Sequence, residues 1–331
     1  MPMRLRALTL TIVAALVAAT TVHAAEFTDS AGRKVNLPDK VGRLLPAGPP
    51  ADVLLYALAP DLLVGLVEPW NDDAKQAVPQ RFQALPGVPR LTSHNLSSED
   101  LEKLRQLKAD LVVDYGDINP NYVALADRIQ ASLGVPYVLI DGKLREAPLV
   151  LRRLGEAIGR PDRGQELAGA VQIALALIDG AGTAAADQRL PFYYARGGDG
   201  LQGVRAGSSV GEAIELAGGR NVVPSARGAF IGLTVADVVQ LTPRMVIVAD
   251  AAAVQPGSAL RTSLPAGTRF FVDRGAPYGI IEKPPSLNRI LGALAVAALI
   301  HPDRAEAFNT AAARLATVMF GDSAKFESLR D

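Results

Sequence analysis

Six aromatic or cationic side chains of the 331-residue sequence stand in loops that follow or separate short apolar runs. A large ring in such a loop offers a ligand a flat apolar surface, and a guanidinium binds anions through charge-assisted hydrogen bonds. We therefore predict a site that holds its ligand by shape and charge. The predicted ligand contacts are Trp70, Tyr115, Arg196, Arg227, Arg274 and Tyr278.

A serine motif supports a competing, catalytic interpretation. Gly207-Ser-Ser-Val-Gly211 has the spacing of a nucleophile elbow, and Asp250 or Asp273 followed by His301 has the chain order of an α/β-hydrolase triad. The elbow needs a strand directly before its serine, and the preceding segment is a weak strand. We favour a serine that caps the next helix, and keep an exported hydrolase using Ser209 and His301 as an alternative.

A glycine motif has the spacing of a dinucleotide-binding loop. Gly198-Asp-Gly-Leu-Gln-Gly203 follows an apolar run, but the next helix starts only near Ser208. A pyrophosphate site needs the helix to begin within the glycines. We expect a glycine-rich turn at the edge of the ligand site.

Composition argues against direct capture of a metal ion. The chain has no cysteine and only three histidines, and a haem ligand would have to be His94, Met245 or a tyrosine. We expect neither a resident metal nor a cofactor. A preformed metal chelate needs no protein ligand to its metal, so it stays compatible with these residues.

The charge balance excludes a nucleic-acid partner. There are 34 basic and 34 acidic residues, and a surface that binds polyanions needs a basic excess.

The length is enough for two ordinary domains. We expect the protein to be a monomer.

Residues 1–24 predict a cleavable signal peptide. A basic start with Arg4 and Arg6 precedes an apolar run that ends in small residues. The run is shorter than the roughly 20 residues that span a bilayer, so we expect cleavage after Ala24. No cysteine follows to carry a lipid anchor. These features predict a periplasmic protein that is free of the membrane.

Short apolar runs alternate with amphipathic stretches, the pattern of βα units around a parallel sheet. They form two groups: 43–46, 62–67, 110–114 and 136–140, then 191–195, 245–249 and 269–272. Ligands collect beyond the carboxyl ends of parallel strands. The loops predicted to form the site are 47–50, 68–71, 115–117, 196–198, 225–228 and 274–278.

The region between the two groups, 146–187, lacks a strand-like run. Its apolar residues recur at helical spacing, and Pro161 is well placed to open a second helix. That helix, of about 20 residues, would span roughly 30 Å. We predict a stiff helical connector.

Several blocks, in order along the chain, carry a resemblance to a known family. They are 27–38 and 58–65, then 101–113, then 217–221 ahead of 241–248, and finally 284–292. By these blocks the chain resembles the periplasmic substrate-binding proteins of iron-siderophore, haem and cobalamin ABC importers.

The resemblance implies an α/β fold in which two Rossmann-like lobes with parallel sheets are joined by a single long connecting helix. The lobes would be residues 25–145 and 188–331, with the connecting helices at 146–187. Members of this family dock on their permease through one acidic side chain per lobe. The matching residue in the first lobe is Glu102; in the second lobe Ala236 stands at the expected position, and Asp237 follows it.

We therefore predict the periplasmic binding component of an ABC importer, which delivers a metal chelate to an inner-membrane permease and its ATPase. A ferric siderophore-like complex is the first ligand choice. A small oxyanion such as molybdate or tungstate is the alternative, because arginines and helix N-termini also hold small anions. A scaffold or sensor that has lost transport is a further alternative, suggested by Ala236.

Overall fold

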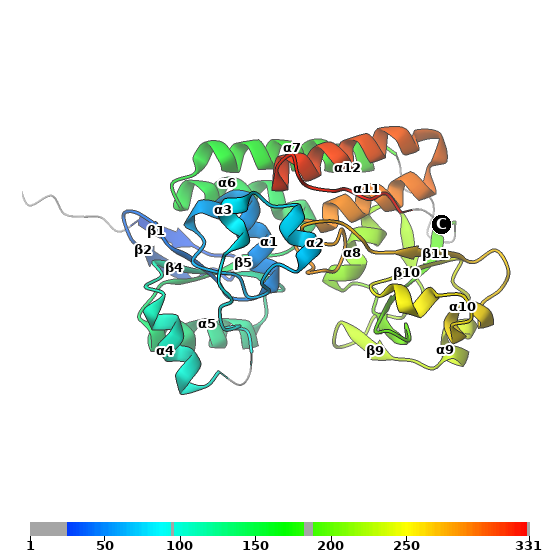
Figure 1. Cartoon of the computed structure of the whole chain (residues 1–331), viewed down its shortest axis with the longest axis horizontal. Coiled ribbons are helices and arrows are strands. Elements are labelled where there is room, and N and C mark those ends of the chain that lie inside the picture. The colour runs from blue at the N-terminus through cyan, green and yellow to red at the C-terminus, as the bar shows by residue number, and fades with distance from the viewer. Residues whose placement is uncertain (1–24, 94–95, 182–187, 330–331) are drawn as a thin grey trace, which may run out of the picture.

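The computed structural model describes residues 25–93, 96–181 and 188–329. Within them, two α/β halves lie side by side, and a layer of helices runs along one side of both (Figure 1). The predicted signal peptide and the haem-ligand alternative His94 lie outside the described residues.

The first half is built on a parallel sheet in the order β3-β4-β5. Its strands are β3 (Leu44–Pro46), β4 (Leu111–Gly116) and β5 (Tyr137–Asp141). Alternate residues of β4 enter different cores: Val113 packs in the cluster that contains α1, and Val112 in the cluster that contains α4 and α5. Both faces are therefore buried, which explains why these strands are continuous apolar runs in the sequence.

Local signals start the helices of this half. Pro49 and Pro50 open α1, Ser97 forms a capping box with Asp100 at α4, and the Asn119 side chain caps α5. The helices are α1 (Pro49–Leu58), η1 (Pro60–Leu62), α2 (Asp72–Gln76), α3 (Gln80–Gln83), α4 (Ser98–Gln106) and α5 (Pro120–Leu133).

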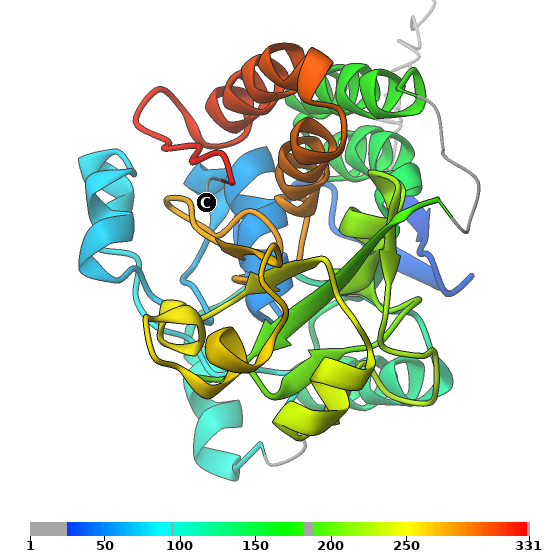
Figure 2. The ribbon, with the colours of Figure 1, turned by 90° about the vertical axis from the view of Figure 1, so that its right-hand side faces the viewer.

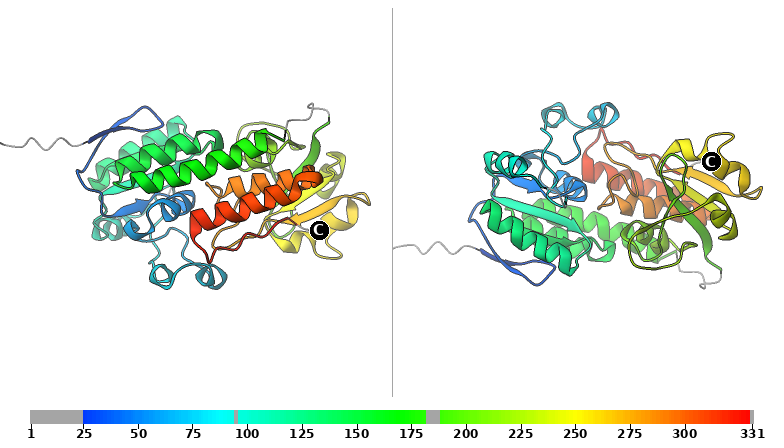
Figure 3. Two further views of the ribbon diagram at one scale, coloured as in Figure 1. Left: turned by 90° about the horizontal axis from the view of Figure 1, so that it is seen from above. Right: turned by 90° about the horizontal axis from the view of Figure 1, so that it is seen from below.

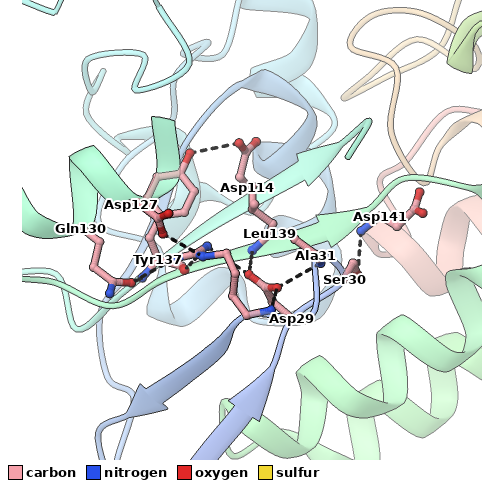
Figure 4. Close-up of polar contacts among 10 residues, drawn as sticks. Asp29, Ser30, Ala31, Asp114, Asp127, Gln130, Tyr137, Leu139 and Asp141 are labelled. Carbon is pink, nitrogen blue, oxygen red and sulfur yellow. Dashed lines mark hydrogen bonds and ion pairs between the residues drawn. The ribbon is translucent and has the colours of Figure 1, made fainter. Parts of the chain in front are cut away.

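A β-hairpin that the sequence did not predict precedes this sheet. It consists of β1 (Ala25–Thr28) and β2 (Lys34–Leu37). Figure 4 shows how its turn is tied to β5: the Asp29 carboxylate accepts the amide of Leu139 at 3.2 Å, and the Ser30 hydroxyl accepts that of Asp141 at 2.9 Å. The buried Tyr137 hydroxyl donates to Asp114 at 3.0 Å.

The second half contains a mixed sheet. β6, β10 and β11 are parallel, β8 adds in parallel to β6, and β7 and β9 extend the sheet in antiparallel pairs. The strands are β6 (Leu190–Arg196), β7 (Gln202–Val204), β8 (Gly219–Asn221), β9 (Phe230–Gly232), β10 (Met245–Val248) and β11 (Arg269–Val272). Figure 2 views the molecule from the side of this half.

The helices of the second half are mostly short until the C-terminus. They are α8 (Ser209–Leu216), α9 (Val235–Gln240), η3 (Ala251–Val254), α10 (Ala259–Ser263), α11 (Arg289–Ile300), η4 (Pro302–Arg304) and α12 (Ala305–Phe320).

The connector is a pair of closely packed helices. After η2 (Leu144–Glu146) come α6 (Ala147–Ala157) and α7 (Pro161–Asp179), which Pro161 opens as predicted. A Cβ on Gly155 would lie 2.9 Å from the Cα of Gly164, so the two backbones approach as closely as glycine allows. Seen from above, α7 and α12 lie side by side across both halves (Figure 3).

One apolar core continues from one half into the other. The same buried cluster contains Leu111 of the first sheet, Phe192 of the second and Phe320 at the end of α12. The ring of Phe320 stacks on Tyr56 of α1, with centroids 6.4 Å apart. The C-terminal helix thus returns to the first half and binds it to the second.

The predicted strand at 62–67 is wrong. Residues Pro60–Leu62 form η1, and only isolated bridges follow, Leu44 with Leu63 and Leu66 with Gly87. A Cβ at Gly65 would lie 2.6 Å from the carbonyl oxygen of Pro86, so the chain passes that loop too closely for regular pairing. Among the described residues, no helix is both long and apolar enough to cross a membrane.

Candidate functional site

A cleft of about 1400 Å³ lies between the two halves. Five of the six loops predicted from the sequence contribute to its walls, and only 225–228 does not. The first half supplies the start of α1, residues around 68–76 and part of the α5 region, while the second supplies loops after β6, β10 and β11. The cleft thus lies where the rule for parallel sheets places it.

The predicted rings Trp70 and Tyr278 meet across the two halves. Their centroids are 5.2 Å apart, and Tyr56 packs against Trp70 at 5.1 Å. Both line the cleft, but each is only 7% exposed, and the Trp70 indole donates to the carbonyl of Phe82 at 2.9 Å. The two rings form an aromatic floor that joins the halves. Most of their surface is covered by other side chains of the protein and is not open to a ligand.

The Tyr278 hydroxyl is buried and has no hydrogen-bond partner among the described residues. Burial raises its pKa well above 10.0, and the nearby Asp52 carboxylate raises it further. The group therefore stays protonated in the floor of the cleft.

The third predicted ring, Tyr115, does not line the cleft. It is 2% exposed, and its hydroxyl donates weakly to the carbonyl of Gly142 at 3.4 Å.

Two of the three predicted arginines reach the cleft. Arg274 is exposed on its wall and has no partner among the described residues. Arg196 also lines it, but its guanidinium lies 2.7 Å from Glu282 and 4.3 Å from the centre of the Phe230 ring. Arg227 is exposed in the loop that does not line the cleft. The structure thus does not bring the three together as an anion clamp.

The carboxyl of Glu282, which lines the cleft, has a raised pKa. Burial raises its pKa to about 7, although Arg196 and Lys283 lower it, while Asp273 raises it. Near neutral pH, both the ionised and the protonated form of Glu282 are therefore populated. Arg196 faces a fully ionised carboxylate only above that pH range.

Among the rings and arginines that line the cleft, three were not predicted from the sequence: Arg90, Tyr122 and Phe230. Tyr122 follows a predicted strand and could have been found by extending that loop by a few residues. Arg90 and Phe230 carry no such signal, because neither follows a predicted strand.

A second cavity, of about 140 Å³, lies beyond the carboxyl ends of β4 and β5. Arg90, Asp114, Tyr115 and Asp117 line it from the first half, and Ser209 and Arg289 from the second. Its two aspartates would repel an anion. Most of the hydrogen-bond donors of Arg289 are already bound to other groups of the protein.

Arg289 connects the halves from a fully buried position. Its guanidinium donates to the carbonyl of Gly142 in the first half, to that of Ser209 in the second, and to Glu212 at 2.8 Å. Glu212 also accepts the amide of Leu144 at 3.0 Å. This network holds the first half against the N-terminus of α8.

Comparisons with known proteins agree with this architecture. The chain superposes on an ABC transporter solute-binding protein of Sulfurospirillum deleyianum with a TM-score of 0.76 and 22% identity, covering 89% of this chain and 95% of that one. It matches the molybdate periplasmic binding protein of Haemophilus influenzae, bound to molybdate, with a TM-score of 0.67 and 19% identity over 91% and 99%.

A third match is the periplasmic vitamin B12 binding protein of Vibrio cholerae, with a TM-score of 0.57 and 18% identity over 83% of this chain and 98% of that one. The chain has the fold of periplasmic solute-binding proteins. The predicted fold class and the resemblance are therefore confirmed at the level of the fold. No protein-family model matches the sequence, and no curated protein is similar to it.

The predicted docking residues of this solute-binding fold lie on one side of the molecule. Glu102 is exposed on α4 and Asp237 on α9, and both helices lie opposite α7 and α12 (Figure 1). Within the described part of the chain, the Glu102 carboxylate has one ion-pair contact, a long one with Arg105 at 3.4 Å. The Asp237 carboxylate is engaged at the start of α9, where it accepts the Thr234 amide at 2.8 Å.

Neither the hydrolase alternative nor a dinucleotide-binding loop finds geometric support. Ser208 caps α8, and Ser209 contacts the start of α11, whereas His301 follows the end of that 12-residue helix, about 18 Å away along it. Asp273 is buried and accepts three backbone amides. The glycine motif at 198–203 lies between β6 and β7, which pair as a hairpin, so no helix starts there.

Proposed function

We propose that the chain is the periplasmic substrate-binding component of an ABC importer, and that it binds a ferric siderophore-like chelate in the cleft between its halves. The fold supports a binding protein and not an enzyme. The observation that carries the choice of ligand is the cleft itself, with its volume of about 1400 Å³ and walls from both halves.

Size separates a chelate from a small oxyanion. Ligand pockets are usually about 300–1,000 Å³, so this cleft suits a large and compact guest. A molybdate ion would leave most of it filled with water. The smaller cavity has a suitable size for an oxyanion, but Asp114 and Asp117 face the same space. The cleft is therefore the better supported site, and the chelate the better supported ligand.

The walls of the cleft offer the contacts that a chelate shell requires. Among the described residues, no group of three or more histidine, aspartate and glutamate side chains is arranged to hold a metal ion. Rings and cations are present instead, with Tyr122 and Phe230 beside Arg90 and Arg274. Such groups bind the organic shell of a complex and leave its metal ligands in place.

A thermal-shift and calorimetric screen of the purified mature protein tests this function. The probes are a ferric tris-catecholate, ferrioxamine B, haem, cobalamin and molybdate. A ligand that binds only the folded state stabilises it by about 2.7 kcal/mol at one hundred times its dissociation constant. We expect a ferric chelate to give the largest shift. A shift with molybdate alone would overturn the choice of ligand.

We also propose that Glu102 and Asp237 dock the loaded protein on the permease. Their place on one face supports this role, since a flat membrane partner can contact both at once. The test is stimulation of the ATPase in the reconstituted transporter by the Glu102→Arg and Asp237→Arg variants. Glu99→Arg is the matched control, because Glu99 is exposed on the same helix and forms an exposed ion pair with Lys103. Loss of stimulation in all three variants would contradict specific docking.

A further inference from the structure

Two large aromatic side chains stay exposed on opposite walls of the cleft. Tyr122 of α5 is 36% exposed, and Phe230 of β9 is 39% exposed. The other exposed large hydrophobic side chains among the described residues, Leu149 and Ile173, lie on α6 and α7 and do not line the cleft. The two rings thus offer apolar surface to whatever enters from either side.

The Phe230 ring is polarised by its neighbours. Arg196 places its guanidinium 4.3 Å from the ring centre, and Glu282 holds that guanidinium at 2.7 Å. A cation on one face draws electron density from the ring. The surface that remains exposed therefore favours an electron-rich partner, such as a deprotonated aryl group, over a saturated chain.

Tyr122 lies in the capped first turn of α5, and its ring is uncharged. Its amide donates to the Asn119 side chain at 3.2 Å, which holds the first turn of α5. Burial raises the pKa of its hydroxyl, and the carboxylates of Asp114 and Asp117 raise it further, so the phenol keeps its proton. Arg90 lines the same cleft, and its guanidinium donates to Thr92 at 2.8 Å without an ion-pair partner in the described part of the chain.

Each half therefore contributes one exposed ring with an arginine near it. We propose that Tyr122 and Phe230 stack against aryl groups of the bound ligand, so that the cleft selects chelates with catecholate-type donors over those with aliphatic hydroxamate or carboxylate donors. This inference rests on the proposed function and concerns only the donor class of the chelate. The cations Arg90 and Arg274 add a preference for negative charge.

The experiment compares three ferric probes by isothermal titration. A hexadentate tris-catecholate is anionic and has rings, ferric citrate is anionic without rings, and ferrioxamine B has neither feature. The variants are Tyr122→Leu and Phe230→Leu, which keep apolar bulk, and Phe230→Tyr, which keeps a ring. Ile173→Ala removes an exposed apolar side chain away from the cleft and serves as the control.

We expect each leucine variant to weaken binding of the tris-catecholate about three- to tenfold, the size of an aromatic contact, with ferric citrate changed less than about twofold. Phe230→Tyr should restore wild-type affinity, and Ile173→Ala should have no effect. Equal binding of ferrioxamine B, or unchanged binding in both leucine variants, would overturn aryl selection and leave chelate binding intact. If none of the three probes binds, the proposed function fails, and aryl selection fails with it.

Discussion

In each half of the molecule, a buried aspartate accepts hydrogen bonds from a segment that borders the cleft. The two aspartates differ in the number of hydrogen-bond donors around them. Asp52 accepts the amides of Val67 and Glu68, at 3.0 and 2.9 Å. Asp273 accepts three amides of the 280–282 segment and the Tyr194 hydroxyl, the latter at 2.8 Å.

The difference matters because both carboxyls are taken out of water. Burial raises the pKa of Asp52 to about 7, so its two donors do not offset the loss of hydration near neutral pH. Burial also raises the pKa of Asp273, while its four donors stabilise the charged form. A buried aspartate can thus hold a loop firmly only when enough donors surround it.

The cleft arginines show a parallel difference. Arg90 of the first half has no carboxylate partner among the described residues, whereas Arg196 of the second half is paired with Glu282. The same residue type therefore supplies an available charge at Arg90 and an occupied one at Arg196.

The largest expected effect concerns the junction of the two halves. In Arg289→Met, the carbonyls of Gly142 and Ser209 lose a buried donor, and the partly exposed carboxylate of Glu212 keeps only the Leu144 amide. A buried acceptor left without its donor costs about 1–3 kcal/mol, so we expect a total loss of about 3–5 kcal/mol in urea unfolding. The control Lys103→Ala removes only an exposed ion pair, and should leave the urea midpoint almost unchanged. Equal losses would mean that Arg289 does not hold the halves together.

The next effect tests the count of donors directly. We expect Asp273→Ala to lower the free energy of unfolding by about 3–4 kcal/mol and Asp52→Ala by about 2 kcal/mol, because more donors lose their acceptor in the first variant. Equilibrium unfolding of both variants in urea gives the comparison. An equal or larger loss in Asp52→Ala would break the proposed relation between donors and anchoring.

The weaker anchor should also show itself in the dependence of stability on pH. The pKa of Asp52 rises from 3.8 in the unfolded chain to about 7 in the folded state, so between these values the folded state binds more protons. The free energy of unfolding therefore falls as the pH rises through that window. Between about pH 5 and about pH 8, the wild type should lose about 2.5 kcal/mol of its free energy of unfolding through this group, and Asp52→Asn should not show this loss. Parallel curves for the two proteins would exclude Asp52 as the source.

The smallest effect separates the two arginines. Arg90→Ala should weaken binding of an anionic ferric chelate about tenfold, which is about 1.4 kcal/mol, because it removes an available cation. At about pH 8, where Glu282 is mostly ionised, Arg196→Ala should cost about threefold or less, since Glu282 then offsets its charge. Calorimetric titration of both variants would measure the ratio. A larger loss for Arg196 would reverse the assignment of available and occupied charge.

The sequence allowed the buried parallel strands to be predicted, because strands covered on both faces are continuous apolar runs; the predicted run 245–249 contains β10, whose four residues are all buried. It also allowed most of the cleft loops to be predicted from the position of those strand ends. In the second half, β7 falls in the segment before the serine motif, which the sequence indicates only as a weak strand. The strands β8 and β9 were missed, because strands of three residues carry little pattern.

The fine structure of the site depends on contacts between distant segments, which no local pattern contains. Nothing near Arg196 in the sequence indicates its pairing with Glu282, and nothing near Trp70 indicates its packing on Tyr278. Arg289 lies in a block that carried the resemblance, but its role became visible only with its partners around it. Local spacing therefore predicted most of the loops that border the cleft, and not which charges and rings are free within it.

The aromatic floor has a practical consequence. Trp70 is the only tryptophan of the chain, and it touches rings from both halves while bordering the cleft. Its intrinsic fluorescence should therefore report, without an added label, any movement of one half relative to the other. A change in tryptophan emission on ligand binding would allow the binding rate to be measured directly.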